Sequence, residues 1–183
     1  MATRLTPAEY LAGEAEQADR HEYVNGEIVA MSGVSSAHNR ITSNLHVALA
    51  NGLRGGPCRV NMPDLRVLVD ETGLYAYPDL TVVCGPPEYT ADTVPSLRNP
   101  CVIVEVLSES TANHDLGAKA AHYRRRASVE TLLLVDSRSR RVQRQTRNAD
   151  GTWTLADLDD GEIEVAGVVL TFDQIYEDMA LGG

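Results

Sequence analysis

The sequence feature that most constrains the fold is a nearly continuous apolar run at residues 101–107, Cys-Val-Ile-Val-Glu-Val-Leu. A run of this length and composition is typical of a central β-strand that is buried on both faces of a sheet. Glu105 lies inside the run, and an isolated ionised carboxylate is very costly in a low-dielectric interior. The run therefore predicts a buried strand whose acid has a partner.

A second acid, Asp79, follows Pro78 at the start of another apolar run, residues 80–83. Strand pairing brings opposing side chains to about 5 Å, so two acids near the same edge of neighbouring strands would repel each other. A shared divalent cation removes that repulsion, and hard oxygen ligands suit Mg²⁺. Two structural alternatives stay open: Asp79 as a turn residue, and Glu105 as a buried acid paired with Arg66 or Arg124.

The remaining pattern predicts one domain over residues 1–183, of the α/β (α+β) class. Thr6-Pro7 begins a helix, and Asn25-Gly26 joins two short alternating runs as a β-hairpin. Further helices are expected at about 35–53, 110–126 and 172–179, and further strands at 58–69, 76–84, 131–135, 142–146, 152–158, 163–165 and 168–170. This order predicts a mixed β-sheet flanked by helices, with N-terminal and C-terminal β-hairpins.

Composition excludes some classes of function. The net charge of −10 argues against a protein that coats nucleic acid non-specifically, although arginines gathered at 124–126 and 138–147 allow one local basic patch. The first ten residues lack the apolar segment of a secretory signal, and no run is long enough to cross a membrane. We expect a cytoplasmic protein whose Cys58, Cys84 and Cys101 are structural thiols; their spacing does not suggest a zinc site.

Lys119 is the only lysine of the chain and lies on the helix expected after the Glu105 strand. Helical spacing puts it on one face with Asp115, His122 and Tyr123. A lysine that reaches a phosphate or its attacking water can stabilise the charge that develops in phosphoryl transfer. The alternative is a solvated helix lysine, as most lysines are.

These residues resemble the Uma-type family of restriction-endonuclease-like proteins, within the PD-(D/E)XK nuclease superfamily. The resemblance covers nearly the whole chain, and it is carried by residues 22–28, 38–41, 64–67, 77–80, 100–108 and 115–125. It implies a restriction-endonuclease-like core for the mixed sheet. The combination of motifs is specific, although each motif alone is weak.

The resemblance implies a role for each matching residue. Asp79 and Glu105 become metal ligands, with the Val106 carbonyl as a third. The usual active-site lysine lies two residues after the second acid, where this chain has Leu107, and in the Uma-type pattern Lys119 takes its place.

Secondary candidates for the same cleft are Glu22, Glu27, His38, Asp64 and Tyr123. Each has a structural alternative. Glu22 and Glu27 can keep a hairpin soluble, and His38 can serve as a helix cap. Asp64 can pair with Arg66, and Tyr123 can be a packing residue.

The function expected from this set is a Mg²⁺-dependent or Mn²⁺-dependent endonuclease that cleaves DNA, acting as a homodimer because a duplex has two strands. The hairpin at 142–158 and the terminal residues Ile175, Tyr176 and Met179 are the expected dimer surfaces. One alternative is a catalytically inactive module for dimerisation or nucleic-acid binding, favoured by Leu107 and by the acidic net charge. Another is a metal-dependent phosphodiesterase that acts on RNA or nucleotides.

Overall fold

The centre of the fold is a six-stranded mixed sheet. The computed structural model describes residues 4–31, 33, 35–108 and 115–179. The strand order is β10-β9-β8-β7-β6-β3, with β7 and β8 parallel and the other neighbours antiparallel. The strands are β3 Cys58–Asn61, β6 Leu80–Cys84, β7 Val102–Leu107, β8 Thr131–Asp136, β9 Val142–Arg147 and β10 Trp153–Leu158. The predicted mixed sheet is confirmed.

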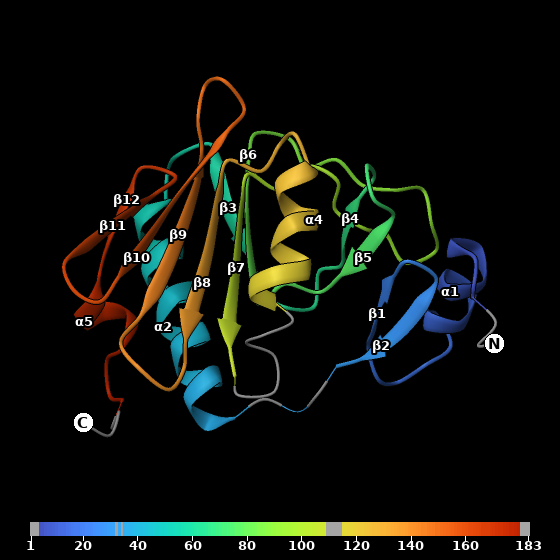
Figure 1. Ribbon diagram of the computed structural model, residues 1–183, viewed down its shortest axis with the longest axis horizontal. Helices are drawn as coiled ribbons and strands as arrows, with labels where there is room; N and C mark the ends of the chain where they lie inside the picture. The colour runs from blue at the N-terminus through green and yellow to red at the C-terminus, as the bar shows by residue number, and fades with distance from the viewer. Residues whose placement is uncertain (1–3, 32, 34, 109–114, 180–183) are drawn as a thin grey trace.

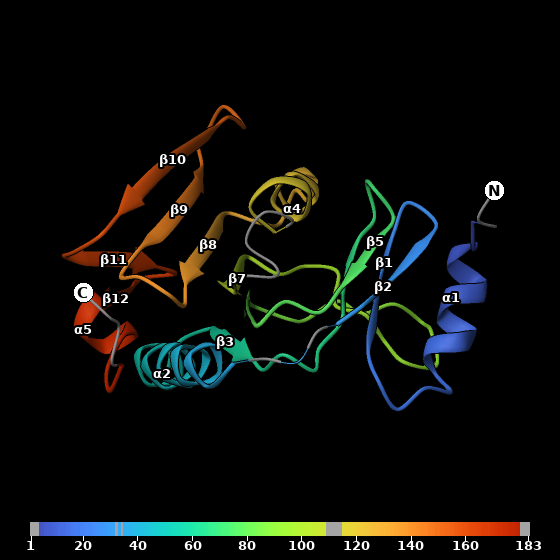
Figure 2. The same ribbon diagram turned by 60° about the horizontal axis from the view of Figure 1, so that its bottom comes forward.

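Helices cover both faces of this sheet, as Figure 2 shows. Helix α2, Ser36–Gly52, lies on one face, and α4, Ala120–Arg125, lies on the other after a π-helical turn, η1, Asp115–Lys119. Alternate residues of β7 enter the two cores: Val104 and Val106 pack with the α2 side, and Ile103 packs with the α4 side. The prediction that residues 101–107 form a strand buried on both faces is confirmed.

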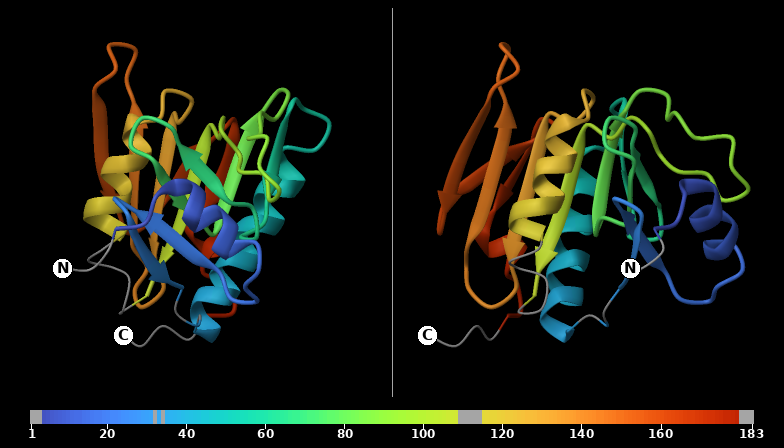
Figure 3. Two further views of the ribbon diagram at one scale, coloured as in Figure 1. Left: turned by 90° about the vertical axis from the view of Figure 1, so that its right-hand side faces the viewer. Right: turned by 45° about the vertical axis from the view of Figure 1, so that its right-hand side comes forward.

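A second sheet packs beside the first, with order β2-β1-β5-β4. Its strands are β1 His21–Val24, β2 Glu27–Ala30, β4 Val67–Val69 and β5 Leu74–Ala76. One face packs tyrosines against helix α1, Pro7–Glu14, at the end of the molecule (Figures 1 and 3). The other face adds Val69 and Leu74 to the core under α4. The β1–β2 hairpin turns at Asn25 and Gly26, whose φ angles of 52° and 90° fit the predicted Asn-Gly turn.

Two expected strands are wrong in their extent. Residues 58–69 form β3 and β4, which belong to different sheets, and residues 76–84 are interrupted between β5 and β6. Pro63 and Pro78 lie in the two breaks, and proline cannot donate a ladder hydrogen bond. The chain therefore crosses between the sheets twice, and the second crossing carries Asp79.

The C-terminal segment closes the α2 side with β11 Glu162–Val165, β12 Val168–Thr171 and the short helix α5 Phe172–Ile175. Ile175 and Tyr176 are buried, so the expectation that they form a dimer surface is wrong. The expected start of the helix near residue 110 lies outside the described residues. Within the part of the chain that the structure describes, no helix is both long enough and apolar enough to cross a membrane.

The expectation of three free thiols is also wrong, because Cys58 and Cys84 form a disulfide. They are direct partners in the register of β3 and β6, whereas Cys101 is free and buried. Their separation of 26 residues gives no local signal of this pairing.

Gly52, at the end of α2, lies where the β11–β12 hairpin packs on that helix. A Cβ atom at Gly52 would overlap the Val168 side chain, lying 2.8 Å from Cγ2, whereas one at Gly13 in α1 would meet nothing within 4 Å. We expect Gly52→Ala to lower the free energy of unfolding by about 1–3 kcal/mol through overpacking. Chemical denaturation measures this change, and adding Val168→Ala should restore part of the loss.

Gly13→Ala is the matched control, since alanine in an unobstructed helix is favoured over glycine by roughly 0.5–1 kcal/mol. Equal effects of the two alanines would contradict the close packing of α2 on β12.

Candidate active site

Lys119 joins two buried acids that come from different sheets. Its Nζ atom lies 2.9 Å from Glu22 Oε1, on β1, and 2.9 Å from Glu105 Oε1, on β7. All three residues are buried, with exposed fractions of 5%, 6% and 4% for Lys119, Glu22 and Glu105. The solitary lysine is therefore a buried ionic partner and not a solvated helix residue.

The local helix geometry places Lys119 and Tyr123 on the same acid. Tyr123 OH donates a hydrogen bond of 2.7 Å to Glu105 Oε1, so two of the four residues of the predicted helix face, Lys119 and Tyr123, meet Glu105. Lys119 is the last residue of the π-helical turn η1, directly before α4. Single π-turns of this kind are rare and frequently occur at functional sites.

Asp79 lies beside this group with partners of its own. Its Oδ1 is 2.8 Å from Nε2 of His38, on α2, and its Oδ2 accepts a 2.7 Å hydrogen bond from the Val106 backbone N–H. Leu80 pairs with Val104 in the antiparallel register of β6 and β7. Asp79 itself lies in the bend that directly precedes β6, the turn position that the structural alternative expected, and its bond to Val106 places it beside the residue that follows Glu105.

Glu105 is a buried acid paired with a cation, as the structural alternative expected, but the cation is Lys119 and neither Arg66 nor Arg124. Arg66 stacks on the rings of Tyr10 and Tyr75 and donates to Ser96 Oγ, and Arg124 donates to Gln145. The acid is held instead by an ammonium and a phenol, as described above. A divalent cation is thus not needed to explain how these two acids are accommodated, because Lys119 contacts Glu105 and His38 contacts Asp79.

The donor chemistry of the pair nevertheless fits Mg²⁺ or Mn²⁺. Among the described residues there is no group of three or more His, Cys, Asp or Glu side chains arranged to hold a metal. Mg²⁺ usually takes only one or two protein carboxylates and completes its shell with water and phosphate oxygens. Among the described contacts of this cluster, three carboxylates outnumber the one ammonium, which favours a dication.

The other sequence candidates divide into two groups. Glu22, His38 and Tyr123 lie in the cluster. Glu27 is exposed on β2, and the exposed Asp64 pairs with Arg20 at 3.1 Å and not with Arg66.

A polar network behind Glu22 was missed by the sequence reasoning. The Tyr77 backbone N–H donates to Glu22 Oε1 at 3.1 Å, and Tyr77 OH donates to Glu14, which also contacts His21 Nδ1 at 3.1 Å. Burial raises the pKa of Tyr77, so its hydroxyl stays protonated and donates at neutral pH. Tyr77 and Glu14 are 63 residues apart in the chain, so no local pattern predicts their contact.

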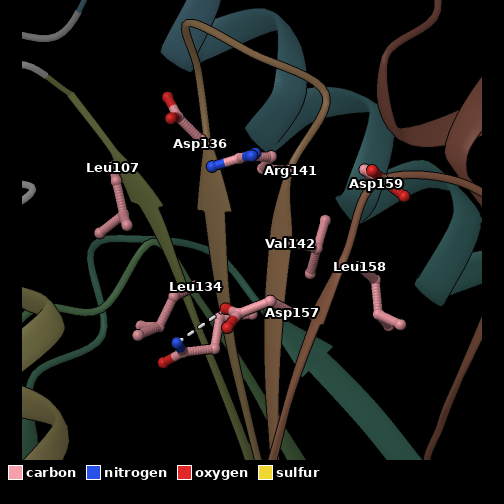
Figure 4. Close-up of a pocket in the computed structure, with 9 residues that line it drawn as sticks. Leu107, Leu134, Asp136, Arg141, Val142, Asp157, Leu158 and Asp159 are labelled. Carbon is pink, nitrogen blue, oxygen red and sulfur yellow. Dashed lines mark hydrogen bonds between the residues drawn. The ribbon is translucent and has the colours of Figure 1, made fainter.

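A surface pocket of about 500 Å³ is lined by Leu107 of β7 and by residues of β8, β9 and β10, which Figure 4 shows. Its charged lining consists of Asp136, Asp157 and Asp159 against Arg141. Although burial opposes ionisation, hydrogen bonds from Arg138 and Ser139 hold the pKa of Asp136 below its ordinary value. A predominantly acidic lining disfavours a phosphate group in this pocket.

Comparison with known proteins agrees with the fold. Residues 7–173 match the Uma2 family, which is described as "Putative restriction endonuclease". Two uncharacterized proteins of Synechocystis are each 34% identical. One, slr1290, aligns over 97% of this chain and 94% of its own length, and the other, sll1609, over 87% and 92%.

A crystal structure from Anabaena variabilis, described as a "putative nuclease belonging to DUF820", has the same fold with a TM-score of 0.75. It is 18% identical, and the alignment covers 93% of this chain and 97% of that one. Fold and family matches both span nearly the whole chain, and we conclude that this protein belongs to the Uma2 family of restriction-endonuclease-like proteins.

Proposed function

We propose that this protein is a divalent-metal-dependent endonuclease that hydrolyses phosphodiester bonds of DNA. The observation that carries the proposal is that Asp79 bonds to Val106, the residue after Glu105, while the buried Lys119 contacts Glu105 itself. Membership of the Uma2 family, and the description of the Anabaena protein as a "putative nuclease", support the reaction class. A cytoplasmic location, where the substrate lies, is part of the same proposal.

Asp79 and Glu105 would hold Mg²⁺ or Mn²⁺, with the Val106 carbonyl as a third ligand. When bound, the ion would supply Lewis-acid polarisation of the phosphate and lower the pKa of an attacking water. His38 positions Asp79 through the Nε2–Oδ1 contact of 2.8 Å, and Tyr123 positions Glu105 through its hydroxyl.

Lys119 contributes the positive charge that a phosphoryl-transfer site requires. Its ammonium would orient the attacking water or stabilise the charge that develops on phosphate oxygens. Burial strengthens this effect, since charges interact more strongly at low dielectric. Glu22 holds the same ammonium from the opposite sheet, at 2.9 Å, and so sets its position relative to Glu105.

A catalytically inactive module is the second candidate, and one observation favours it. The Lys119 ammonium is engaged by two carboxylates, and the position two residues after Glu105 carries Leu107, which packs in the core. Such a protein would keep the fold for dimerisation or nucleic-acid binding. Cleavage of RNA or nucleotides instead of DNA is a further outcome that a substrate panel would identify.

We expect purified protein to nick or linearise plasmid DNA with Mg²⁺ or Mn²⁺, and Asp79→Asn and Lys119→Met to slow cleavage by roughly 100-fold or more. Asp79→Asn keeps the size of the side chain, whereas Lys119→Met leaves two buried acids without their ammonium and costs about 3–5 kcal/mol of stability. The thermal stability of each variant is therefore measured together with its cleavage rate. Asp64→Asn, on the exposed Arg20 pair, is the matched control and should cleave like the wild type.

If the Asp79→Asn and Lys119→Met variants both cleave at the wild-type rate, the cleavage activity does not belong to this site.

Metal binding separates the enzyme from the inactive module. We expect isothermal titration with Mn²⁺ to show binding that Glu105→Gln weakens at least about tenfold, because a ligand oxygen is replaced by an amide. Asp64→Asn should bind like the wild type. Absence of binding to the folded wild type would favour the module.

We also propose a homodimer, with the β9–β10 hairpin as its surface, since β10 carries Leu155 with 53% of its surface exposed. Light scattering at micromolar concentration should give twice the chain mass of 19.9 kDa, and Leu155→Asp should halve it. A wild-type monomer at that concentration would remove the dimer from the proposal.

A further inference from the structure

The three cysteines form a cluster that the proposed nuclease chemistry does not use. Cys58 and Cys84 are disulfide-bonded across β3 and β6, and the free Cys101 Sγ lies 3.3 Å from Cys84 Sγ. The cluster lies at the end of β6 that is farther from Asp79, because Asp79 directly precedes the first residue of that strand. A thiol and a disulfide in direct contact are the reactants of thiol–disulfide exchange.

Cys58 also lines a surface pocket of about 270 Å³ between the end of α2 and β3. Three of its lining residues have basic side chains, His46, Arg54 and Arg59, and none has an acidic one. The arginines are exposed and donate to Asn51 and to backbone carbonyls, and neither takes part in an ion pair within the described residues. In a chain of net charge −10, this pocket is locally positive.

We propose that Cys58, Cys84 and Cys101 form a thiol–disulfide exchange site, in which Cys101 displaces Cys58 from Cys84. The Cys101 thiolate attacks Cys84 Sγ, the Cys84–Cys101 bond forms, and the Cys58–Cys84 bond breaks. The electron pair of the broken bond leaves on Cys58 as a thiolate, and the proton of Cys101 goes to solvent. The number of disulfides is unchanged, so the step needs no oxidant or reductant.

The surroundings of Cys58, the leaving group, and of Cys101, the attacking thiol, determine the rate of this exchange. Neighbouring cations stabilise a thiolate, and a stabilised thiolate is a better leaving group, so the basic pocket favours release of Cys58. Burial raises the pKa of the attacking Cys101 thiol, and the charge of Glu130 raises it further. Exchange is therefore slow at neutral pH and faster in alkaline solution.

The released Cys58 thiolate faces a pocket suited to an anionic low-molecular-weight disulfide. It would attack one sulfur of that molecule, form a mixed disulfide and release the other half as an anionic thiol. The arginines would bind the carboxylates of such a reagent, and a cationic disulfide would be repelled. This inference goes beyond the proposed nuclease function and does not depend on it.

The internal exchange is tested by alkylating the folded, non-reduced protein with iodoacetamide and mapping labels and disulfides by mass spectrometry. We expect the label on Cys58 together with a Cys84–Cys101 disulfide, formed roughly tenfold faster per pH unit below the pKa of Cys101. Cys101→Ser should leave Cys58 unlabelled with its disulfide intact. Label only on Cys101, no label at all, or label on Cys58 in Cys101→Ser would overturn the proposal.

The ligand class is tested with oxidised glutathione as an anionic disulfide and cystamine as a cationic one. We expect Cys58 to form the mixed disulfide several-fold faster with oxidised glutathione, and Arg59→Gln to reduce that preference. Arg40→Gln, an exposed arginine of α2 that does not line the pocket, is the matched control. Equal rates with both reagents would overturn the assignment of the pocket to an anionic ligand.

Discussion

The structure depends on one buried ammonium shared between two carboxylates. Lys119 contacts Glu22 in the N-terminal sheet and Glu105 in the central sheet, residues that are 83 positions apart in the chain. Removing one partner from such a group leaves an uncompensated buried charge, which costs about 3–5 kcal/mol. The shared ammonium therefore ties together the two sheets and the π-turn that carries it, and it fixes the surroundings of Glu105.

The same constraint explains why the candidate chemistry gathers at this point. Asp79 lies on the crossing between the sheets, and α2 adds His38 from the opposite side of the central sheet. Glu105 consequently meets the Lys119 ammonium, while Asp79 bonds to the next residue of the same strand. The proposed metal chemistry would therefore use side chains that two sheets and two helices bring to one place.

Local signals predicted much of the fold. The apolar run around Glu105, the Thr6-Pro7 helix start and the Asn25-Gly26 turn each rest on interactions within a few residues, and all three are confirmed. The helix face shared by Lys119 and Tyr123 was also predictable, because a helix repeats every 3.6 residues.

Long-range contacts were not predictable in this way. Nothing near Glu22 indicates that its partner lies 97 residues away, and nothing near Cys58 indicates a disulfide across two strands.

A crystal grown with Mn²⁺ tests most directly whether Asp79 and Glu105 hold a divalent metal. We expect anomalous density in contact with both carboxylates. Absence of such density at millimolar Mn²⁺, with Lys119 still bridging Glu22 and Glu105, would contradict a metal site there.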